Sequence, residues 1–169
     1  PENFPPLLKE ITDPPERLYV RGILPPNGYK WLTVVGARKY SNYGKEATEA
    51  FIAGLRGYPI VIVSGLALGI DAIAHRAALA ANLLTIAVPG SGLNRTVLYP
   101  STNRQLADDI VKAGGALLSE FEPDFQATTW SFTQRNRILA GLSDAVLVVE
   151  AEQKSGALIT SKFAIEYNR

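Results

Sequence analysis

Five short segments of the chain are almost entirely apolar and rich in β-branched residues. Longer stretches separate them, in which apolar and polar positions recur at helical spacing. Strands with so few polar positions are buried on both faces, which is typical of a parallel sheet covered by helices. The predicted strands are Trp31–Gly36, Ile60–Gly65, Leu84–Gly90, Ala116–Glu120 and Ala145–Ala151.

The segments between these strands have the length of ordinary helices. Strands that alternate with such helices predict right-handed βαβ units and a doubly wound, mostly parallel α/β sheet in three layers. No strand follows the last helix, so we expect that the domain lacks its last strand. The predicted helices are Tyr43–Leu55, Gly69–Ala81, Thr102–Ala113, Phe132–Leu142 and Ala157–Tyr167.

The first part of the chain has a different character. Seven of the eleven prolines fall between Pro1 and Pro26, and proline disfavours both helix interiors and central strands. We therefore interpret residues 1–30 as an extended arm packed on the same domain, with a short strand near Leu18–Arg21. Residues 31–169 form the domain proper. Apolar residues should hold the arm in place: Leu7, Leu8, Ile11, Leu18, Tyr19 and Val20.

Composition restricts the chemistry further. Hydrophobic residues make up 47% of the chain and charged residues 20%, as in a globular domain. Cysteine is absent and His75 is the one histidine, which argues against disulfides and against a zinc site. We expect no metal and no cofactor. No apolar run approaches the roughly 20 residues of a membrane span, so we expect a cytoplasmic protein without membrane contact.

Methionine is absent, even at the first position, so we expect that the sequence is a piece of a longer protein. The 17 basic and 16 acidic residues nearly cancel, to a net charge of +1. Any anion-binding function must therefore come from where the charges lie.

The loops after the strands carry the candidate binding residues. Ligands of open α/β sheets bind at the carboxyl ends of the strands. Glycine lets backbone approach a ligand, and helix N-termini attract anions. Gly65 and Gly69 taken alone fit simple turn chemistry equally well. The candidate phosphate-binding residues in these loops are Gly36, Ala37, Arg38, Lys39, Ser41, Gly65, Gly69, Gly90, Gly92, Asn94, Arg95, Lys154, Ser155 and Gly156.

A second stretch combines aromatic and basic residues, from Trp130 to Arg137. Arginine pairs with phosphate oxygens and exposed aromatic rings stack on unpaired bases, so Phe132, Arg135, Asn136 and Arg137 are candidates. Each aromatic taken singly could instead fill the core. Arg135 and Arg137 diverge on a helix, so we expect one to face the pocket and the other to bind a carboxylate.

No catalytic set is evident. Asp71 is interpreted as a charge at a helix start, and a hydrogen bond to His75, four residues later, is expected. The phosphate-binding GxxxxGK[ST] loop, a GxGxxG fingerprint after the first strand and a G-x-S-x-G elbow are all missing. We therefore expect a binding protein and not an enzyme.

Taken together, six motifs resemble the DNA-processing protein DprA family, also called Smf, from about Phe4 to the last residue. The resemblance implies an extended Rossmann-like domain that binds single-stranded DNA. It also implies a homodimer that protects incoming DNA and loads RecA recombinase in natural transformation. The motifs are FPPLLKEITDPPERLYVRG, VVGARKYSNYG, IVSGLALGIDAIAHRAAL, GSGLNRTVLYP, LLSEFEP and FTQRNRILAGLSDAVLVVEAEQKSGALIT.

In that family a Gly-(Ser/Thr)-Arg turn contacts DNA phosphate, and its counterpart here is Gly36-Ala37-Arg38. Ala37 lacks the hydroxyl, which leaves the backbone N–H groups and the arginine. Arg104 loosely matches a further basic residue. The family's N-terminal helical module and C-terminal winged-helix module are not in this sequence, so the resemblance implies its central domain.

Two alternatives stay open. LOG-type phosphoribohydrolases and nucleotide sensors share the fold class, and Glu120, Glu122 and Glu150 would be the candidate acids. Their PGGxGTxxE pattern is missing, because Pro89-Gly90-Ser91-Gly92 lies one loop too early and continues differently. The other alternative is an interaction scaffold that dimerises through its last helices.

Overall fold

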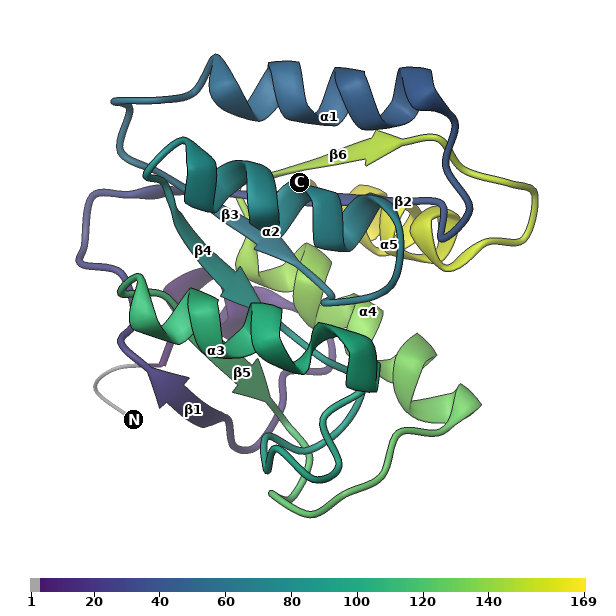
Figure 1. Ribbon diagram of the computed structural model, residues 1–169. Helices are drawn as coiled ribbons and strands as arrows, with labels where there is room; N and C mark the ends of the chain where they lie inside the picture. The colour runs from purple at the N-terminus through teal and green to yellow at the C-terminus, as the bar shows by residue number, and fades with distance from the viewer. Residues whose placement is uncertain (1–3) are drawn as a thin grey trace.

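A six-stranded sheet forms the centre of the molecule in the computed structural model, which describes residues 4–169 (Figure 1). The strand order is β1-β5-β4-β3-β2-β6, and every neighbouring pair is parallel except β1 with β5. This confirms the predicted mostly parallel α/β sheet. The strands are β1 (Tyr19–Gly22), β2 (Lys30–Gly36), β3 (Ile60–Ser64), β4 (Leu84–Ala87), β5 (Ala116–Ser119) and β6 (Ala145–Val149).

Helices cover both faces of the sheet and complete the three layers. In Figure 1, α1, α2 and α3 lie side by side in front of the sheet, and α4 and α5 lie behind it. The 3-10 helix η1 packs against α4. The elements are η1 (Pro6–Glu10), α1 (Asn42–Ala53), α2 (Ile70–Ala80), η2 (Ser101–Asn103), α3 (Arg104–Lys112), α4 (Thr129–Leu142) and α5 (Gly156–Glu166).

Two helix starts differ from the sequence-based expectation. Helix α4 begins at Thr129, three residues before the predicted start, because Thr128 and Ser131 form a reciprocal capping box. Phe132 therefore lies one turn into this helix and not at its first residue. The third predicted helix is divided into η2 and α3, with Asn103 at the junction.

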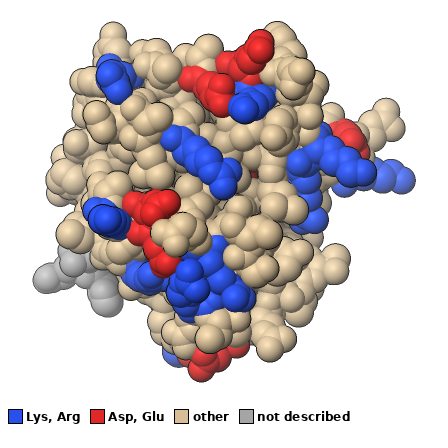
Figure 2. Space-filling model, in the orientation of Figure 1, with Lys and Arg blue, Asp and Glu red and all other residues tan. Residues whose placement is uncertain are grey.

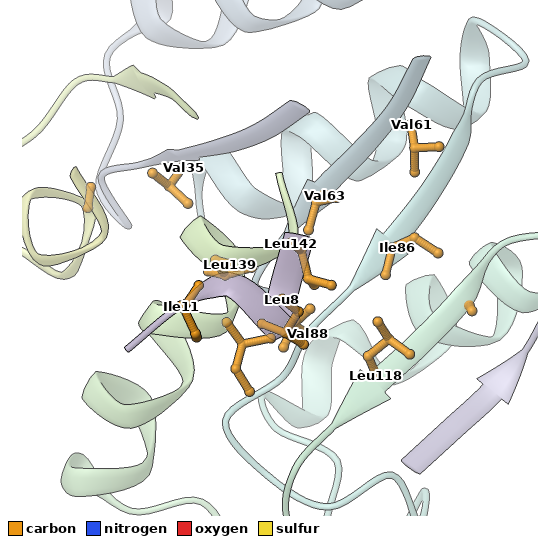
Figure 3. Close-up of a cluster of buried hydrophobic side chains, with 13 residues drawn as sticks. Leu8, Ile11, Val35, Val61, Val63, Ile86, Val88, Leu118, Leu139 and Leu142 are labelled. Atoms are coloured by element: carbon orange, nitrogen blue, oxygen red, sulfur yellow. The ribbon is translucent and has the colours of Figure 1, made fainter. Parts of the chain in front are cut away.

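The central strands send alternate side chains to opposite faces, as a period of two requires. Val61 and Val63 pack toward α4 and η1, in the cluster that Figure 3 shows. Ile62, between them, packs on the other face with residues of α1 and α2. All three side chains are fully buried. This explains why the predicted strands contain almost no polar positions.

The N-terminal arm is part of the same core. Leu8 of η1 is fully buried, and Ile11 lies beside it against α4 (Figure 3). Strand β1 then adds to the edge of the sheet by antiparallel pairing with β5. The arm's predicted strand is thus present, shifted by one residue. Residues 1–3 of the predicted arm lie outside the described residues.

The direction in which the sheet is built reverses at β2. The chain passes from β2 through β3 and β4 to β5 on one side, and β6 then returns to the other side of β2. Helix α1, after β2, lies on one face, and α5, after β6, lies on the other (Figure 1). Such a switch point opens a crevice at the carboxyl ends of the two strands, where α/β sheets bind ligands. Whether a further strand joins β6 stays a prediction.

Candidate nucleic-acid interface

The crevice between the ends of β2 and β6 is a cleft of about 400 Å³. This volume falls within the range of small-ligand sites, roughly 300–1,000 Å³. Its lining draws on the turn after β2, the middle of α4 and the start of α5. The structure therefore brings together nine of the predicted residues: Gly36, Ala37, Arg38, Lys39, Phe132, Arg135, Asn136, Ser155 and Gly156.

An aromatic ring in contact with two guanidinium groups lines this cleft. Arg38 lies over the Phe132 ring at 5.6 Å from the ring centroid, and Arg135 lies at 5.9 Å. The Tyr99 ring approaches Phe132 at 5.3 Å between centroids. Gly90 makes room for this ring, because a Cβ there would lie 2.5 Å from Phe132. Arg38, Phe132 and Arg135 also line a smaller hollow beside the main cleft.

Arg135 lines the cleft, and backbone carbonyls hold its guanidinium group in place. Its Nη1 donates to the carbonyls of Gly65 at 2.8 Å and Val88 at 2.6 Å, and its Nε donates to Asn136 at 3.0 Å. Its Nη2 has no hydrogen-bond partner within residues 4–169. Burial lowers the pKa of Arg135 to about 10, so the group stays charged at neutral pH.

Asp71 supplies the counter-charge beneath the cleft. Its carboxylate accepts a hydrogen bond from the Gly65 N–H at 3.0 Å. Burial raises the pKa of Asp71, and the positive charge of Arg135 opposes that rise. Gly65 allows the arrangement, because a Cβ there would lie 2.7 Å from both Arg135 Nη1 and Asp71 Oδ2. The role of Gly65 is thus to make room for this pair.

The predicted hydrogen bond between Asp71 and His75 was wrong. The His75 Nδ1 lies 2.7 Å from Thr85 Oγ1, which itself donates to the Ile62 carbonyl. The imidazole therefore carries its proton on Nδ1, and Nε2 is buried without a partner. Burial, assisted by the charge of Arg76, lowers the pKa of His75 to about 3. His75 is a neutral core residue far from any general-base role.

This burial makes stability depend on pH. Between pH 6.5 and 3 the unfolded chain binds a proton at His75 that the folded chain does not, so stability falls as the pH falls. Urea unfolding should show about 2 kcal/mol less stability from His75 at pH 5 than at pH 7.5. His75→Gln should lack this part of the pH dependence. Equal pH dependence in both proteins would contradict the assignment.

Ser41 is occupied by a carboxylate from the same chain. The Ser41 N–H donates to Glu150 Oε2 at 2.9 Å, and the Ser41 hydroxyl donates to the other oxygen of Glu150. These bonds lower the pKa of Glu150. The same hydroxyl accepts from the Gly44 N–H at 3.1 Å and caps α1. The N-terminus of α1 therefore holds an anion that the protein itself supplies.

Arg137 turns away from the cleft. Its Nη1 and Nη2 each lie 2.7 Å from an oxygen of Glu120, and its Nε donates to the Asp13 carbonyl at 3.0 Å. The Arg137 side chain is 6% exposed. The expectation that one of Arg135 and Arg137 faces the pocket and the other binds a carboxylate is confirmed. A DNA contact by Arg137 stays an untested prediction, whereas its packing role is visible.

The other candidates lie outside the lining of the cleft. Asn94 pairs with Asp124, Arg95 with Asp108, and Arg104 donates to the carbonyls of Thr96 and Leu98. Gly69 and Gly92 pack against backbone carbonyls, and Lys154 is exposed. Figure 2 shows basic side chains gathered at the right, where the loops after β2 and β6 lie. A second basic area lies below α3, mixed with acidic groups.

Sequence reasoning missed several residues of the site. Tyr99 reaches Phe132 from a loop of the preceding βα unit, and Thr160 and Glu152 complete the cleft lining. Tyr99 could have been predicted, because it is an aromatic residue in the loop that follows a strand. Thr160 could not, because a threonine inside an apolar helix is unremarkable. Tyr40, in the turn after β2, is 45% exposed but does not line the cleft.

Two further classes of site are absent from residues 4–169, namely a membrane-spanning helix and a metal-binding cluster. No helix there combines the length and the apolar character that crossing a bilayer requires. No three His, Cys, Asp or Glu side chains in this part of the chain gather where they could hold a metal ion.

Known proteins match this chain in both sequence and structure. Protein Smf of Escherichia coli is 44% identical over 168 residues, covering 99% of this chain and 44% of Smf. The crystal structure of DprA from Streptococcus pneumoniae superposes with a TM-score of 0.90 at 44% identity, covering 98% and 57% of the two chains. DNA processing protein A from Helicobacter pylori, described for its single-stranded DNA binding mode, gives 0.87 at 34% identity, covering 99% and 76%.

The chain spans about half the length of the two curated relatives from E. coli and S. pneumoniae, 44% of the first and 56% of the second. The family model for DNA recombination-mediator protein A matches residues 1–169. With these matches, the chain belongs to the DNA recombination-mediator protein A family, whose curated members are named DprA and Smf.

Proposed function

We propose that this domain binds single-stranded DNA at the cleft between β2 and β6. Phosphates lie on the turn after β2, where Arg38 and Lys39 are exposed, and a base stacks against Phe132. Gly36 and Ala37 line the cleft beside these phosphates, but the Ala37 N–H is already bound, because it donates to the Glu150 carbonyl at 2.7 Å. The remaining predicted contacts, in the loops of Asn94, Arg95, Arg104 and Lys154, would extend the path of the strand.

One observation carries this proposal: an aromatic ring lies within 6 Å of two cations at the carboxyl edge of a parallel sheet, at 5.6 Å from Arg38 and 5.9 Å from Arg135. Single-strand binding requires a cationic path for phosphates and an aromatic face for bases, and both occur here within one cleft. Cation–π contact also holds Phe132 and Arg38 in a common geometry. The single-stranded DNA binding described for the H. pylori relative supports the same conclusion.

For the whole protein we propose the role of a recombination mediator that protects incoming DNA, dimerises and loads RecA in the cytoplasm during natural transformation. The family's description as a recombination mediator supports the general role. Dimerisation, RecA and the location are supported by the sequence resemblance alone. The proposed role is binding and not catalysis.

The contacts of three carboxylates favour binding over glycosidic hydrolysis. Glu120 is paired with Arg137, Glu150 with Ser41, and Glu122 accepts hydrogen bonds from Tyr19 and Arg17. Each candidate acid of the hydrolase alternative is therefore engaged in a structural contact. None of the three lines the cleft.

Phe132→Leu tests the stacking part of the proposal. Leucine keeps most of the volume but offers no π-face to a base or to Arg38. Stacking contributes about 1–3 kcal/mol per base, so affinity for oligothymidine should fall by about tenfold. Fluorescence anisotropy measures the change, and Phe163→Leu, in α5, is the control. Unchanged affinity in Phe132→Leu would remove Phe132 from the interface.

A further inference from the structure

The first turn of α5 presents hydrogen-bond donors that no group in residues 4–169 accepts. Its residues Ser155, Gly156 and Ala157 line the cleft. The N–H groups of Gly156 and Ala157 have no acceptor within residues 4–169, because the first helical bonds begin with Leu158. The Ser155 hydroxyl precedes the helix, makes no capping bond and is buried without a partner. Three donors therefore lack acceptors at one place.

The N-termini of α1 and α4 already have acceptors for their free N–H groups. Helix α1 holds the carboxylate of Glu150 through the N–H and hydroxyl of Ser41. Helix α4 is closed by the capping box between Thr128 and Ser131. The N-terminus of α1 thus binds a carboxylate of the same chain, whereas the N-terminus of α5 has no such acceptor among residues 4–169.

A buried cation independently points to a ligand in the same cleft. Arg135 is 6% exposed, lines the cleft and has no partner for Nη2 within residues 4–169. Asp71 balances one charge beneath it, while exposed Arg38 adds another at the cleft mouth. Glu152 is the exposed carboxylate of the lining and lies in the loop before α5.

We propose that this cleft seats a phosphate monoester, on the first turn of α5 between Arg38 and Arg135. The ligand is either the terminal phosphate of a DNA strand or a free nucleoside monophosphate. The strand-end form rests on the proposed function, and the free-nucleotide form does not.

A monoester fits this cleft better than an internal diester does. It carries up to two negative charges and three terminal oxygens, which match two arginines and three unpaired donors. The cleft floor is closed by Asp71, Leu139 and Thr160, which are all buried. For a terminal phosphate, only one stretch of the DNA strand passes through the mouth of the cleft. For an internal phosphate, the strand would have to enter and leave through the same opening.

The test compares strand ends by fluorescence anisotropy on the whole 169-residue chain. The probes are oligothymidines of about 15 nucleotides that carry a 5′-phosphate, a 3′-phosphate or hydroxyls at both ends. A hydroxyl-ended probe that is one nucleotide longer has the same number of phosphates as the phosphorylated probes and controls for total phosphate number. Thymidine monophosphate serves as the competitor for the free-nucleotide form. We expect one phosphorylated end to bind about fivefold more tightly than the hydroxyl probe.

Ser155→Asp and Ser155→Asn form the matched pair. Both side chains are good N-caps, so both proteins should fold and melt alike. Aspartate places a carboxylate at the start of α5, as Glu150 does at the start of α1. The ratio of affinities for the phosphorylated and hydroxyl-ended probes should then fall to about one. Asparagine has the same shape without the charge and should keep a preference.

The outcomes separate this inference from the proposed function. An end preference that Ser155→Asp abolishes supports the strand-end form. Competition by thymidine monophosphate that the same variant abolishes supports the free-nucleotide form, even where no oligonucleotide binds. Equal affinity for all ends without competition overturns the inference. DNA binding that still depends on Arg38 would then leave the proposed function standing.

Discussion

Arg137→Ala should lower the free energy of unfolding by about 3–5 kcal/mol. The substitution leaves Glu120, whose side chain is 12% exposed, without its cation partner, and it removes the bond to the Asp13 carbonyl. Such a loss is a large fraction of the roughly 5–15 kcal/mol that stabilises a domain. Urea unfolding at pH 7.5 measures the loss.

Two further proteins make this prediction specific. Arg95→Ala removes an exposed ion pair with Asp108 and should cost less than about 1 kcal/mol. The double variant Arg137→Met with Glu120→Leu removes both charges and should recover most of the stability that Arg137→Ala loses. If Arg137→Ala melted like wild type but lost DNA affinity, Arg137 would belong to the interface and not to the core.

Arg38→Ala should have the opposite profile, with unchanged stability and single-stranded DNA binding weakened by about 10- to 100-fold. The side chain is exposed, and it packs over the Phe132 ring. A hydrogen bond to a charged group contributes about 1.5–3 kcal/mol, which gives this range. The loss should be similar for every base sequence, because phosphate contacts carry no base information.

Arg38→Ala should also reduce the log–log dependence of affinity on salt by about 0.7, the effect of one phosphate contact. Lys112→Ala is the matched control, since Lys112 lies in the last turn of α3, at the opposite end of the sheet from the cleft. A loss confined to some base sequences would mean that Arg38 reads bases. Equal losses in both variants would mean that the effect comes from net charge alone.

The sequence was sufficient for the fold because the core strands are apolar on both sides. The five predicted strands, the alternating helices and the edge strand of the arm all correspond to observed elements. The cleft residues after β2 and at the start of α5 were also predictable, because they lie in or next to the loops that follow two apolar strands. The topological switch at β2 then brings the two loops together.

Side-chain partners could not be read from the chain in the same way. Arg135 and Arg137 look equivalent in the sequence, yet one lines the cleft and the other binds Glu120. Ser41 looked like a phosphate ligand, but Glu150 lies more than a hundred residues away and fills its place. His75 binds Thr85 on a neighbouring strand instead of Asp71 on its own helix. Contacts of this kind depend on tertiary packing, which local spacing does not encode.

In the proposed function, this cleft binds single-stranded DNA through several phosphates and a stacked base. The most direct test titrates the wild-type chain with oligothymidine and with a duplex of equal length, at about 50 and 200 mM salt. We expect tighter binding of the single strand, with a log–log salt slope of about −0.7 for each phosphate contacted. Equal affinity for single strand and duplex, or binding that salt does not weaken, would contradict it.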